Sequence, residues 1–225
     1  MLSIIIPTLN AEKSISRTLD SVQALSLPML EVLVVDGGSS DDTIHRATEL
    51  GAKVVHCDPG RGRQLAHGAS VAKGPWLLFL HADTILPPDW ETDLSRFITA
   101  ERNLGLAGYF RLGFDAKGPG ARRVAALANW RADVLGLPYG DQGLLIHRDL
   151  YKAVGGYRTE HNLMEDVDLV RRIGPMRLKR LNRTVITSAA RYQAGGWWAR
   201  PLRNLLCLGL YLLGAPQSWI ERLYR

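Results

Sequence analysis

Short runs of apolar, largely β-branched residues alternate in the first half of the chain with segments whose apolar residues recur every three or four positions. The runs predict buried strands, and the recurring pattern predicts amphipathic helices. Strands are expected at residues 3–8, 30–38, 53–57 and 76–82, with helices at 12–25, 41–50 and around 64–72. Repeated strand–helix–strand units indicate an α/β fold, with a mostly parallel central sheet that helices flank on both faces.

The pattern becomes less regular after Trp90. A strand is expected at 106–114, a strand running into a helix at 143–151, a short helix at 167–173 and a late strand at 178–188. Residues 115–142 contain several glycines and a Pro-Tyr-Gly-Asp turn, so we expect them to form a mobile loop region. A chain of 225 residues is long enough for one substantial domain and short for two.

Charge is unevenly distributed along the chain. The net charge is +6, and from Arg171 onward eleven lysines and arginines face the single acid Glu221. A basic end is typical of proteins that bind nucleic acid, an anionic membrane or a phosphorylated substrate. The sequence has no zinc-finger, helix-turn-helix or aromatic RNA-binding pattern, so we expect no nucleic-acid partner.

The compartment is predicted from cysteine usage and from the N-terminal residues. Cys57 and Cys207 both lie in apolar stretches and suggest neither a disulfide framework nor a metal cluster. The opening apolar run has no preceding basic residues and is interrupted by Pro7, unlike a signal peptide. A reducing cytoplasm is therefore the expected location.

Polar residues follow four of the predicted strands. These strand ends carry Thr8 to Asn10, Asp36, Asp58 to Arg61, and His81 to Asp83. Each group alone could be a helix cap or a turn. Because ligands of parallel α/β sheets bind beyond the carboxyl ends of the strands, the four groups together predict one site. It would offer carboxylates for a base or ribose, cations for phosphate and Asp83 for a metal.

The motifs at these strand ends resemble those of the family 2 glycosyltransferases of the GT-A fold. Their counterparts here are IIIPTLNAE, EVLVVDGGSSDDT, DPGRGRQLAHGA and FLHADT, followed by GDQGLLIHRDLYKAVGGY and MEDVDL. The resemblance covers roughly residues 2 to 200, and the order and spacing of the motifs make it specific. The H-A-D form, together with TSAAR near the end, is most similar to a small bacterial subgroup associated with arsenosugar or carotenoid glycosylation.

The resemblance implies a donor site in the first half of the chain. Residues 1–100 would form a nucleotide-binding half, 101–195 an acceptor and catalytic half, and 196–225 basic apolar C-terminal helices. The nucleotide site would be formed by Pro7, Thr8, Asn10, Asp36, Arg61 and Arg63, with His81 and Asp83. Asp36 would accept a hydrogen bond from the base, usually uracil. Arg61, with Arg63 nearby, would face the base or the diphosphate, for which a guanidinium is suited because its donors form a rigid fork. Many relatives have asparagine at the position of Ala66, which puts a polar contact there in doubt.

His81 occupies the position of the first carboxylate in the D-x-D pattern of the family. The resemblance implies that Asp83, the second carboxylate, binds Mn²⁺ or Mg²⁺ between the two phosphates. An imidazole can hydrogen-bond a ribose hydroxyl or a metal-bound water through either ring nitrogen. The alternative is that His81 is a structural histidine at a strand end.

The resemblance also implies an acceptor site in the second half. Asp166 would be the general base and Glu165 would support it or bind the acceptor, although acids at a helix start also complement the helix dipole. Asp141 and Gln142 would lie near the sugar or acceptor, or simply form a turn. Trp197 and Trp198 would stack on a sugar or lipid acceptor, or pack in the core.

The expected function is metal-dependent, inverting transfer of a sugar from a nucleotide sugar, most often a UDP-sugar, to an acceptor hydroxyl. A sugar nucleotidyltransferase would normally carry a G-x-G-T-R-like loop, where this chain has PTLNAE. An NAD-dependent oxidoreductase would carry G-x-G-x-x-G, and VVDGGSSD does not have that order. A non-catalytic protein that binds a nucleotide sugar or a lipid remains a third alternative.

The C-terminal segment is apolar but short. Its uncharged stretch, residues 205–216, is about half of the ~20 residues that a membrane-spanning helix needs. Pro216 should divide the segment into two helices, which pack on the domain or lie at a membrane interface. Tryptophans and tyrosines interspersed with arginines favour the interface. We therefore expect peripheral contact with an anionic membrane, on the inner face of the plasma membrane, and a lipid-linked acceptor.

Overall fold

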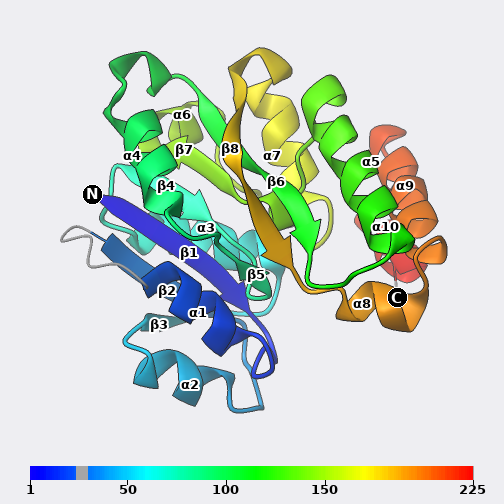
Figure 1. Cartoon of the computed structure of the whole chain (residues 1–225), viewed down its shortest axis with the longest axis horizontal. Helices are drawn as coiled ribbons and strands as arrows, with labels where there is room; N and C mark the ends of the chain where they lie inside the picture. The colour runs from blue at the N-terminus through cyan, green and yellow to red at the C-terminus, as the bar shows by residue number, and fades with distance from the viewer. Residues whose placement is uncertain (24–29, 225) are drawn as a thin grey trace.

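The computed structural model describes residues 1–23 and 30–224, and it forms a central sheet flanked by helices (Figure 1). Within the described residues the sheet has eight strands in the order β3-β2-β1-β4-β7-β6-β8-β5. The strands are β1 (Leu2–Thr8), β2 (Leu30–Asp36), β3 (Lys53–His56), β4 (Trp76–Phe79), β5 (Thr84–Ile85), β6 (Ala107–Phe114), β7 (Leu144–His147) and β8 (Leu178–Thr187).

Helices connect the strands and close the C-terminal end of the chain (Figure 1). They are α1 (Ile15–Gln23), α2 (Thr43–Glu49), α3 (Arg61–Val71), α4 (Trp90–Thr99), α5 (Pro119–Leu135), α6 (Arg148–Ala153), α7 (Glu165–Ile173), α8 (Ala190–Gly195), α9 (Ala199–Leu212) and α10 (Gln217–Tyr224). Three short 3₁₀ helices are η1 (Glu101–Asn103), η2 (Gly140–Gln142) and η3 (Pro175–Arg177).

The sheet is mixed and mostly parallel, as the sequence predicts. β1 pairs in parallel with β2 and β4, β2 with β3, and β6 with β8. β7 runs antiparallel to both β4 and β6, and β5 runs antiparallel to β8. Six strands therefore share one direction, and their carboxyl ends meet along one edge of the sheet.

Two hydrophobic cores lie on opposite faces of this sheet. Successive side chains of a strand point to opposite faces. Ile4 and Ile6 accordingly pack with α1 and α4, whereas Ile5 packs with Leu65 and Ala69 of α3. Burial on both faces explains why β1 is a continuous apolar run rather than an alternating one.

The prediction of a mobile loop at residues 115–142 is wrong, because most of this segment forms the 17-residue helix α5. Gly118 and Pro119 start the helix, and Gly136, at φ 63°, ends it in the left-handed conformation that favours glycine. Glycines are typical of flexible loops, but here they lie at the two ends of a helix. Between them, alanines and a valine recur at helical spacing and are buried: Ala121, Val124, Ala128 and Ala132.

Other predicted elements also differ in their boundaries, among them the first helix and the fourth strand. The helix expected at 12–25 begins at Ile15, and its last two predicted residues lie outside the described residues. The strand expected at 76–82 ends at Phe79, although the N–H of Leu80 still donates to the carbonyl of Ile5 at 3.0 Å. The shorter strand leaves His81 and Asp83 in the connection to β5.

The C-terminal segment forms two helices on either side of Pro216, as expected. Cys207 and Leu208 of α9 and Ile220 of α10 pack on Met164 and Val167 at the start of α7. Among the described helices, none has the length and hydropathy needed to cross a bilayer.

Candidate active site

A cavity of about 520 Å³ lies beyond the carboxyl ends of β1 and β4. The first turn of α3 forms one wall of it, and the segment between β4 and β5 forms another. Six residues predicted for the nucleotide site line this cavity: Pro7, Thr8, Asn10, Arg61, His81 and Asp83. The structure therefore brings together polar groups from three separate strand ends.

Asn10 ties the loop after β1 to the loop after β2. Its backbone is in the left-handed region, at φ 52°, which asparagine tolerates better than most residues. Its backbone N–H donates to Ser39 Oγ at 2.9 Å, and its Oδ1 accepts from the N–H of Ser40 at 2.9 Å. These bonds fix the rim of the cavity.

Asp36 lies fully buried beneath this rim. Its carboxylate accepts hydrogen bonds from the N–H groups of Gly38 and Ser39, at 2.8 and 2.9 Å, and from the hydroxyls of Ser39 and Thr8. It does not line the 520 Å³ cavity. The contact between Asp36 and a base stays a prediction, whereas its role in shaping the β2 loop is seen directly.

The two arginines of α3 face different surroundings. Arg61 lies at the start of the helix and lines the cavity, where its guanidinium is 3.6 Å from Glu165 Oε1. Arg63 faces outward and pairs with the exposed Asp58 at 3.5 Å. Of the two, Arg61 is positioned to meet an anionic ligand in the cavity.

A smaller cavity of about 100 Å³ adjoins the first and shares Arg61, His81 and Asp83 with it. It reaches the acids of the second half of the chain: Asp141, Glu165 and Asp166. Residues of α8, α9 and α10 close its other side: Tyr192, Arg200, Asn204 and Tyr224. These four were not predicted from the sequence. Asn204, a polar residue within an apolar segment, is a sequence signal that could have pointed to them.

The three acids at the start of α7 have three different environments. Glu165 faces Arg61, and Asp166 accepts hydrogen bonds from the N–H groups of Gly140 and Val167, both at 2.7 Å. Asp168 lies on another side of the helix, where it accepts from Arg172 Nε at 3.0 Å and from the hydroxyl of Tyr211 at 3.1 Å. Asp168 therefore links α7 to α9, and Glu165 and Asp166 are left to face the cavity.

Several oxygen atoms in this region are buried without a hydrogen-bond partner among the described residues. They include Asp141 Oδ1, Glu165 Oε1 and Asn204 Oδ1, and all three residues line the smaller cavity. Buried acceptors without partners are costly unless a ligand or water supplies donors. The smaller cavity is thus suited to a ligand that carries hydroxyl groups.

His81 is held beneath η2. A Cβ atom on Gly140 would lie 2.4 Å from His81 Nε2, so only glycine allows this close approach. Burial, together with the charges of Arg61 and Arg191, lowers the pKa of His81 well below its usual value. The imidazole is therefore neutral at pH 7 and can accept a hydrogen bond as well as donate one.

Asp83 has a carboxylate that forms no hydrogen bond or ion pair within the described part of the chain, while its backbone carbonyl accepts from the N–H of Ser188. No group of three or more histidine, cysteine or acidic side chains is close enough there to hold a metal. Mg²⁺ and similar cations are often bound by one or two carboxylates, with the remaining ligands supplied by substrate phosphates and water. A free carboxylate beside a neutral imidazole fits such a cation.

Three residues predicted for the acceptor site lie outside both cavities. Gln142 is buried, where it donates to the carbonyl of Phe110 at 3.1 Å and accepts from the N–H of Tyr139 at 3.3 Å. Trp197 stacks on the ring of Tyr192 at 5.3 Å, and Trp198 is 70% exposed. Contact of these residues with an acceptor stays a prediction, whereas Asp141 lines the smaller cavity.

Glu165 should make the stability of the free protein depend on pH. Burial and the charge of Asp166 raise its pKa to about 8, from 4.5. The folded protein then binds more protons than the unfolded chain between these values, so stability falls as pH rises through this window. We expect the unfolding temperature to fall from about pH 5 to about pH 8, and Glu165→Gln to remove much of that fall.

Thermal unfolding followed by circular dichroism across this pH range measures the effect. Glu160→Gln, which changes an exposed glutamate, is the matched control and should keep the wild-type pH profile. Burial also raises the pKa of Asp141, to about 6, so a residual slope below that pH is expected in Glu165→Gln. A Glu165→Gln profile identical to wild type would show that Glu165 titrates alike in the folded and unfolded states.

Comparison with known proteins gives a family match. Residues 3–147 match the model described as Glycosyl transferase family 2. The chain is 40% identical over 93 residues to a PGL/p-HBAD biosynthesis glycosyltransferase of Mycobacterium bovis, which covers 38% of this chain and 36% of that protein. It is 33% identical over 96 residues to glucosyl-3-phosphoglycerate synthase of Mycobacterium tuberculosis, which covers 38% and 30%. The chain thus matches about a third of the length of these curated relatives.

Solved structures with a similar fold extend over nearly the whole chain. Glucosyl-3-phosphoglycerate synthase from Mycobacterium tuberculosis, in complex with Mn²⁺, UDP and glucosyl-3-phosphoglycerate, has a TM-score of 0.62 at 21% identity and covers 97% of this chain and 81% of that chain. A mannosyltransferase from Pyrobaculum calidifontis, in complex with GDP-Man and Mn²⁺, has a TM-score of 0.63 at 18% identity and covers 90% and 59%. At these identities the likeness shows the fold, and it confirms the predicted α/β fold of the GT-A type.

Proposed function

Because this chain belongs to glycosyltransferase family 2, we propose that it transfers a sugar from a nucleotide sugar to an acceptor hydroxyl. The observation that carries the proposal is the position of Asp83. Its unpaired carboxylate lies on the boundary between a cavity large enough for a nucleotide and a smaller cavity that contains Asp166. Donor and acceptor would therefore meet beside Asp83, the one carboxylate that lines both cavities of the described chain.

The donor is proposed to be a UDP-sugar held in the larger cavity. Thr8 and Asn10 would contact the nucleoside, and Arg61 would face the diphosphate through its guanidinium. Similar structures contain UDP or GDP-Man together with Mn²⁺, which supports a nucleotide sugar and a divalent cation. Asp83 would hold the Mn²⁺ or Mg²⁺ ion, which when bound would stabilise negative charge on the departing diphosphate.

Asp166 is proposed as the general base. The N–H groups of Gly140 and Val167 hold its carboxylate at the edge of the smaller cavity. It would accept the proton of an acceptor hydroxyl as the hydroxyl oxygen bonds to the anomeric carbon and the bond to the diphosphate oxygen breaks. Attack from the face opposite the leaving group inverts the anomeric configuration. Burial and the charge of Asp166 raise the pKa of Glu165 to about 8, so Glu165 is mostly protonated at neutral pH and is the weaker candidate for this role.

The proposed setting of the reaction is cytoplasmic. Cys57 and Cys207 are both free thiols, which fits a reducing compartment. We propose a lipid-linked acceptor and a peripheral position on the inner face of the plasma membrane. Membership of the H-A-D subgroup, associated with arsenosugar or carotenoid glycosylation, is likewise proposed from the resemblance.

A panel of nucleotide sugars tests the proposed function. The protein is incubated with each UDP-, GDP- and ADP-sugar and Mn²⁺, and both nucleotide release and thermal stabilisation are measured. We expect stabilisation by UDP-sugars that requires Mn²⁺, and slow release of UDP that an added acceptor alcohol accelerates. Stabilisation by UDP without turnover on any acceptor would instead favour the non-catalytic binding protein.

A further inference from the structure

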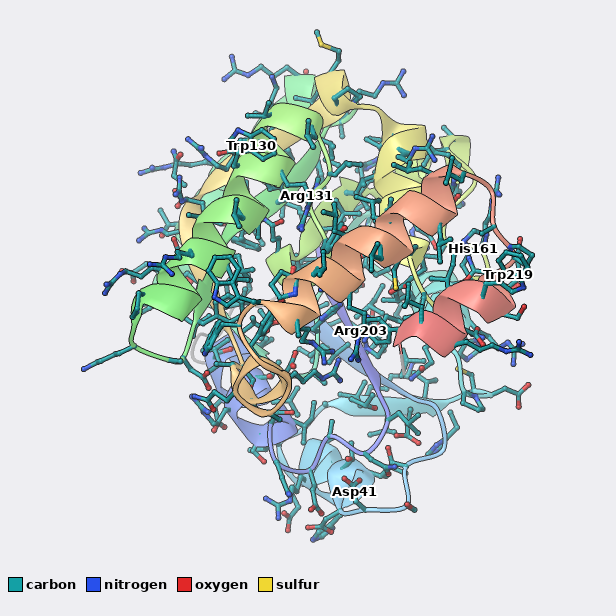
Figure 2. All side chains as sticks on the ribbon, turned by 90° about the vertical axis from the view of Figure 1, so that its right-hand side faces the viewer. Asp41, Trp130, Arg131, His161, Arg203 and Trp219 are labelled. Carbon is teal, nitrogen blue, oxygen red and sulfur yellow. The ribbon has the colours of Figure 1, made fainter. Side chains whose placement is uncertain are left out.

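Helices α5 and α9 lie side by side on one face of the molecule, and both present apolar side chains to solvent (Figures 1 and 2). This arrangement is not predictable from the sequence, whose pattern predicts a loop at residues 115–142. We call the exposed surface of α5, α9 and α10 the α5–α9 face. Its apolar residues are Leu127, Trp130, Val134, Leu135, Trp198, Leu202, Leu205, Leu206, Leu212, Leu213 and Trp219.

The apolar residues of α5 form a stripe along the helix. Leu127, Trp130 and Val134 are spaced by three and four residues, so they lie on one side, and each is more than half exposed. Alanines of the opposite side, such as Ala128 and Ala132, pack on the domain. Figure 2 shows Trp130 on α5, on the side of the molecule that faces the viewer.

A second stripe runs along α9. Trp198 precedes the helix, and Leu202, Leu205 and Leu206 follow at helical spacing, all more than half exposed. Trp219 extends the apolar surface onto α10 (Figure 2). Cys207 and Leu208, on the other side of α9, are buried against α7. The exposed leucines are therefore not needed to pack the helix on the domain.

The two stripes belong to one surface. The guanidinium of Arg123, on α5, lies 5.8 Å from the ring centre of Trp198, beside the start of α9. Monomeric soluble proteins rarely expose contiguous apolar patches of more than a few hundred Å². Eleven large apolar side chains on adjacent helices expose more apolar area than scattered surface residues would. We therefore expect this face to contact another molecule or a membrane when the protein functions.

Basic residues accompany the apolar ones. The three helices carry six arginines, of which Arg122, Arg123 and Arg222 are exposed. The other three are half-buried and donate hydrogen bonds within the molecule: Arg131, Arg200 and Arg203. Their two acids are both engaged within the molecule. Asp133 pairs with Arg180 at 2.6 Å, and Glu221 accepts from Asn162 at 2.9 Å. With three exposed arginines and both acids paired, the α5–α9 face carries a net positive charge, which is complementary to an anionic surface.

We propose that the α5–α9 face docks on the surface of an anionic lipid bilayer, in the plane of the interface. Leucines and tryptophans would enter the boundary between headgroups and acyl chains, and the exposed arginines, Arg122, Arg123 and Arg222, would meet the anionic headgroups. A second copy of this chain is a poorer occupant, because it would bring the same cations together. Apolar residues on this face are interspersed with arginines, as in helices that lie at a membrane surface. The core of a protein–protein interface is instead depleted in charged residues.

Docking of this face would place the smaller cavity close to the lipid. Arg200, Asn204 and Tyr224, which line that cavity, come from the same two C-terminal helices that supply the apolar residues. This inference rests on the proposed function. The acceptor would be a lipid-linked alcohol whose hydroxyl reaches Asp166 while its apolar part stays in the membrane.

Vesicle flotation with the full chain tests the proposal. Neutral phosphatidylcholine vesicles are compared with vesicles that also contain phosphatidylglycerol, without nucleotide sugar. We expect binding to the anionic vesicles that weakens as salt is added. The double variant Trp130→Asp and Leu205→Asp, with one charge on each stripe, should lower the bound fraction roughly tenfold or more. Leu104→Asp, an exposed leucine beyond η1, is the matched control and should bind like wild type.

Three further readouts separate the outcomes. Circular dichroism shows whether the double variant is folded. If it is not, the single variants Trp130→Asp and Leu205→Asp are used in its place. Light scattering reports the oligomeric state: a wild-type dimer that the variants dissociate, without vesicle binding, would assign the face to a second copy and overturn the proposal. Equal binding by wild type and folded variants would overturn it as well. Vesicle binding is measured without a sugar donor and so does not depend on catalysis. A protein that binds vesicles but transfers no sugar would contradict the proposed function and leave the membrane proposal standing.

Discussion

Asp166→Asn is expected to lower the rate of sugar transfer roughly 10²-fold or more, the usual scale for removing a general base. The amide keeps the shape of the side chain, and its oxygen can still accept hydrogen bonds from the N–H groups of Gly140 and Val167. Only the ability to take a proton is lost. Affinity for the nucleotide should change little, because Asp166 lines the smaller cavity and not the larger one. Transfer rates and UDP affinity by calorimetry, measured on the same preparation, separate the two effects.

Two companion variants sharpen this test. Asp149→Asn alters an acid at the exposed start of α6 and should leave both measurements unchanged. Glu165→Gln should reduce transfer less than Asp166→Asn, because Glu165 is mostly protonated at neutral pH. If Glu165→Gln proves the more damaging of the two, Glu165 is the base and Asp166 positions it.

Asp83→Ala is expected to abolish the part of nucleotide binding that depends on Mn²⁺. No other carboxylate lines the larger cavity except Asp115, which pairs with Arg17 at 3.7 Å and accepts from the N–H of Ala189. Calorimetric titration of UDP with and without Mn²⁺ measures the loss. Wild type should bind UDP more tightly when Mn²⁺ is present, and the variant should bind equally weakly in both conditions.

His81→Ala should weaken binding less than Asp83→Ala, since a neutral imidazole can contribute one hydrogen bond or one ligand but no charge. Asp58→Ala removes an exposed carboxylate after β3 and is the control for a general change of charge. Tighter binding of UDP by the Asp83→Ala variant when Mn²⁺ is added, to the same degree as in wild type, would refute the assignment of the metal to Asp83.

The strands of the first half were predictable because each is governed by local sequence. β1 and β2 are continuous apolar runs, and a strand buried on both faces requires such a run whatever the rest of the chain does. The carboxyl ends of parallel strands necessarily meet at one edge. The gathering of Thr8, Arg61 and Asp83 around one cavity therefore followed from the order of elements alone.

The environments of the acids in α7 were not predictable in the same way. Sequence spacing showed that Glu165, Asp166 and Asp168 could not all point in one direction, but it could not choose among them. The choice depends on partners that are remote in sequence. Arg61 lies about a hundred residues before Glu165, and Tyr211 lies 43 residues after Asp168.

The sequence by itself determined the α/β architecture, the strand-end site and the division of the C-terminus at Pro216, because hydrophobic periodicity and backbone-restricting residues act over a few positions. Only the tertiary structure decided that residues 119–135 form a helix rather than a loop, since its alanines become a buried face only once the sheet is there to cover them. It also decided that Asn204 and Tyr224 close the smaller cavity and that two apolar stripes form one surface. Contacts between segments so distant in the chain depend on how the helices pack against one another. The residue pattern of a single segment does not reveal which other segment it will contact.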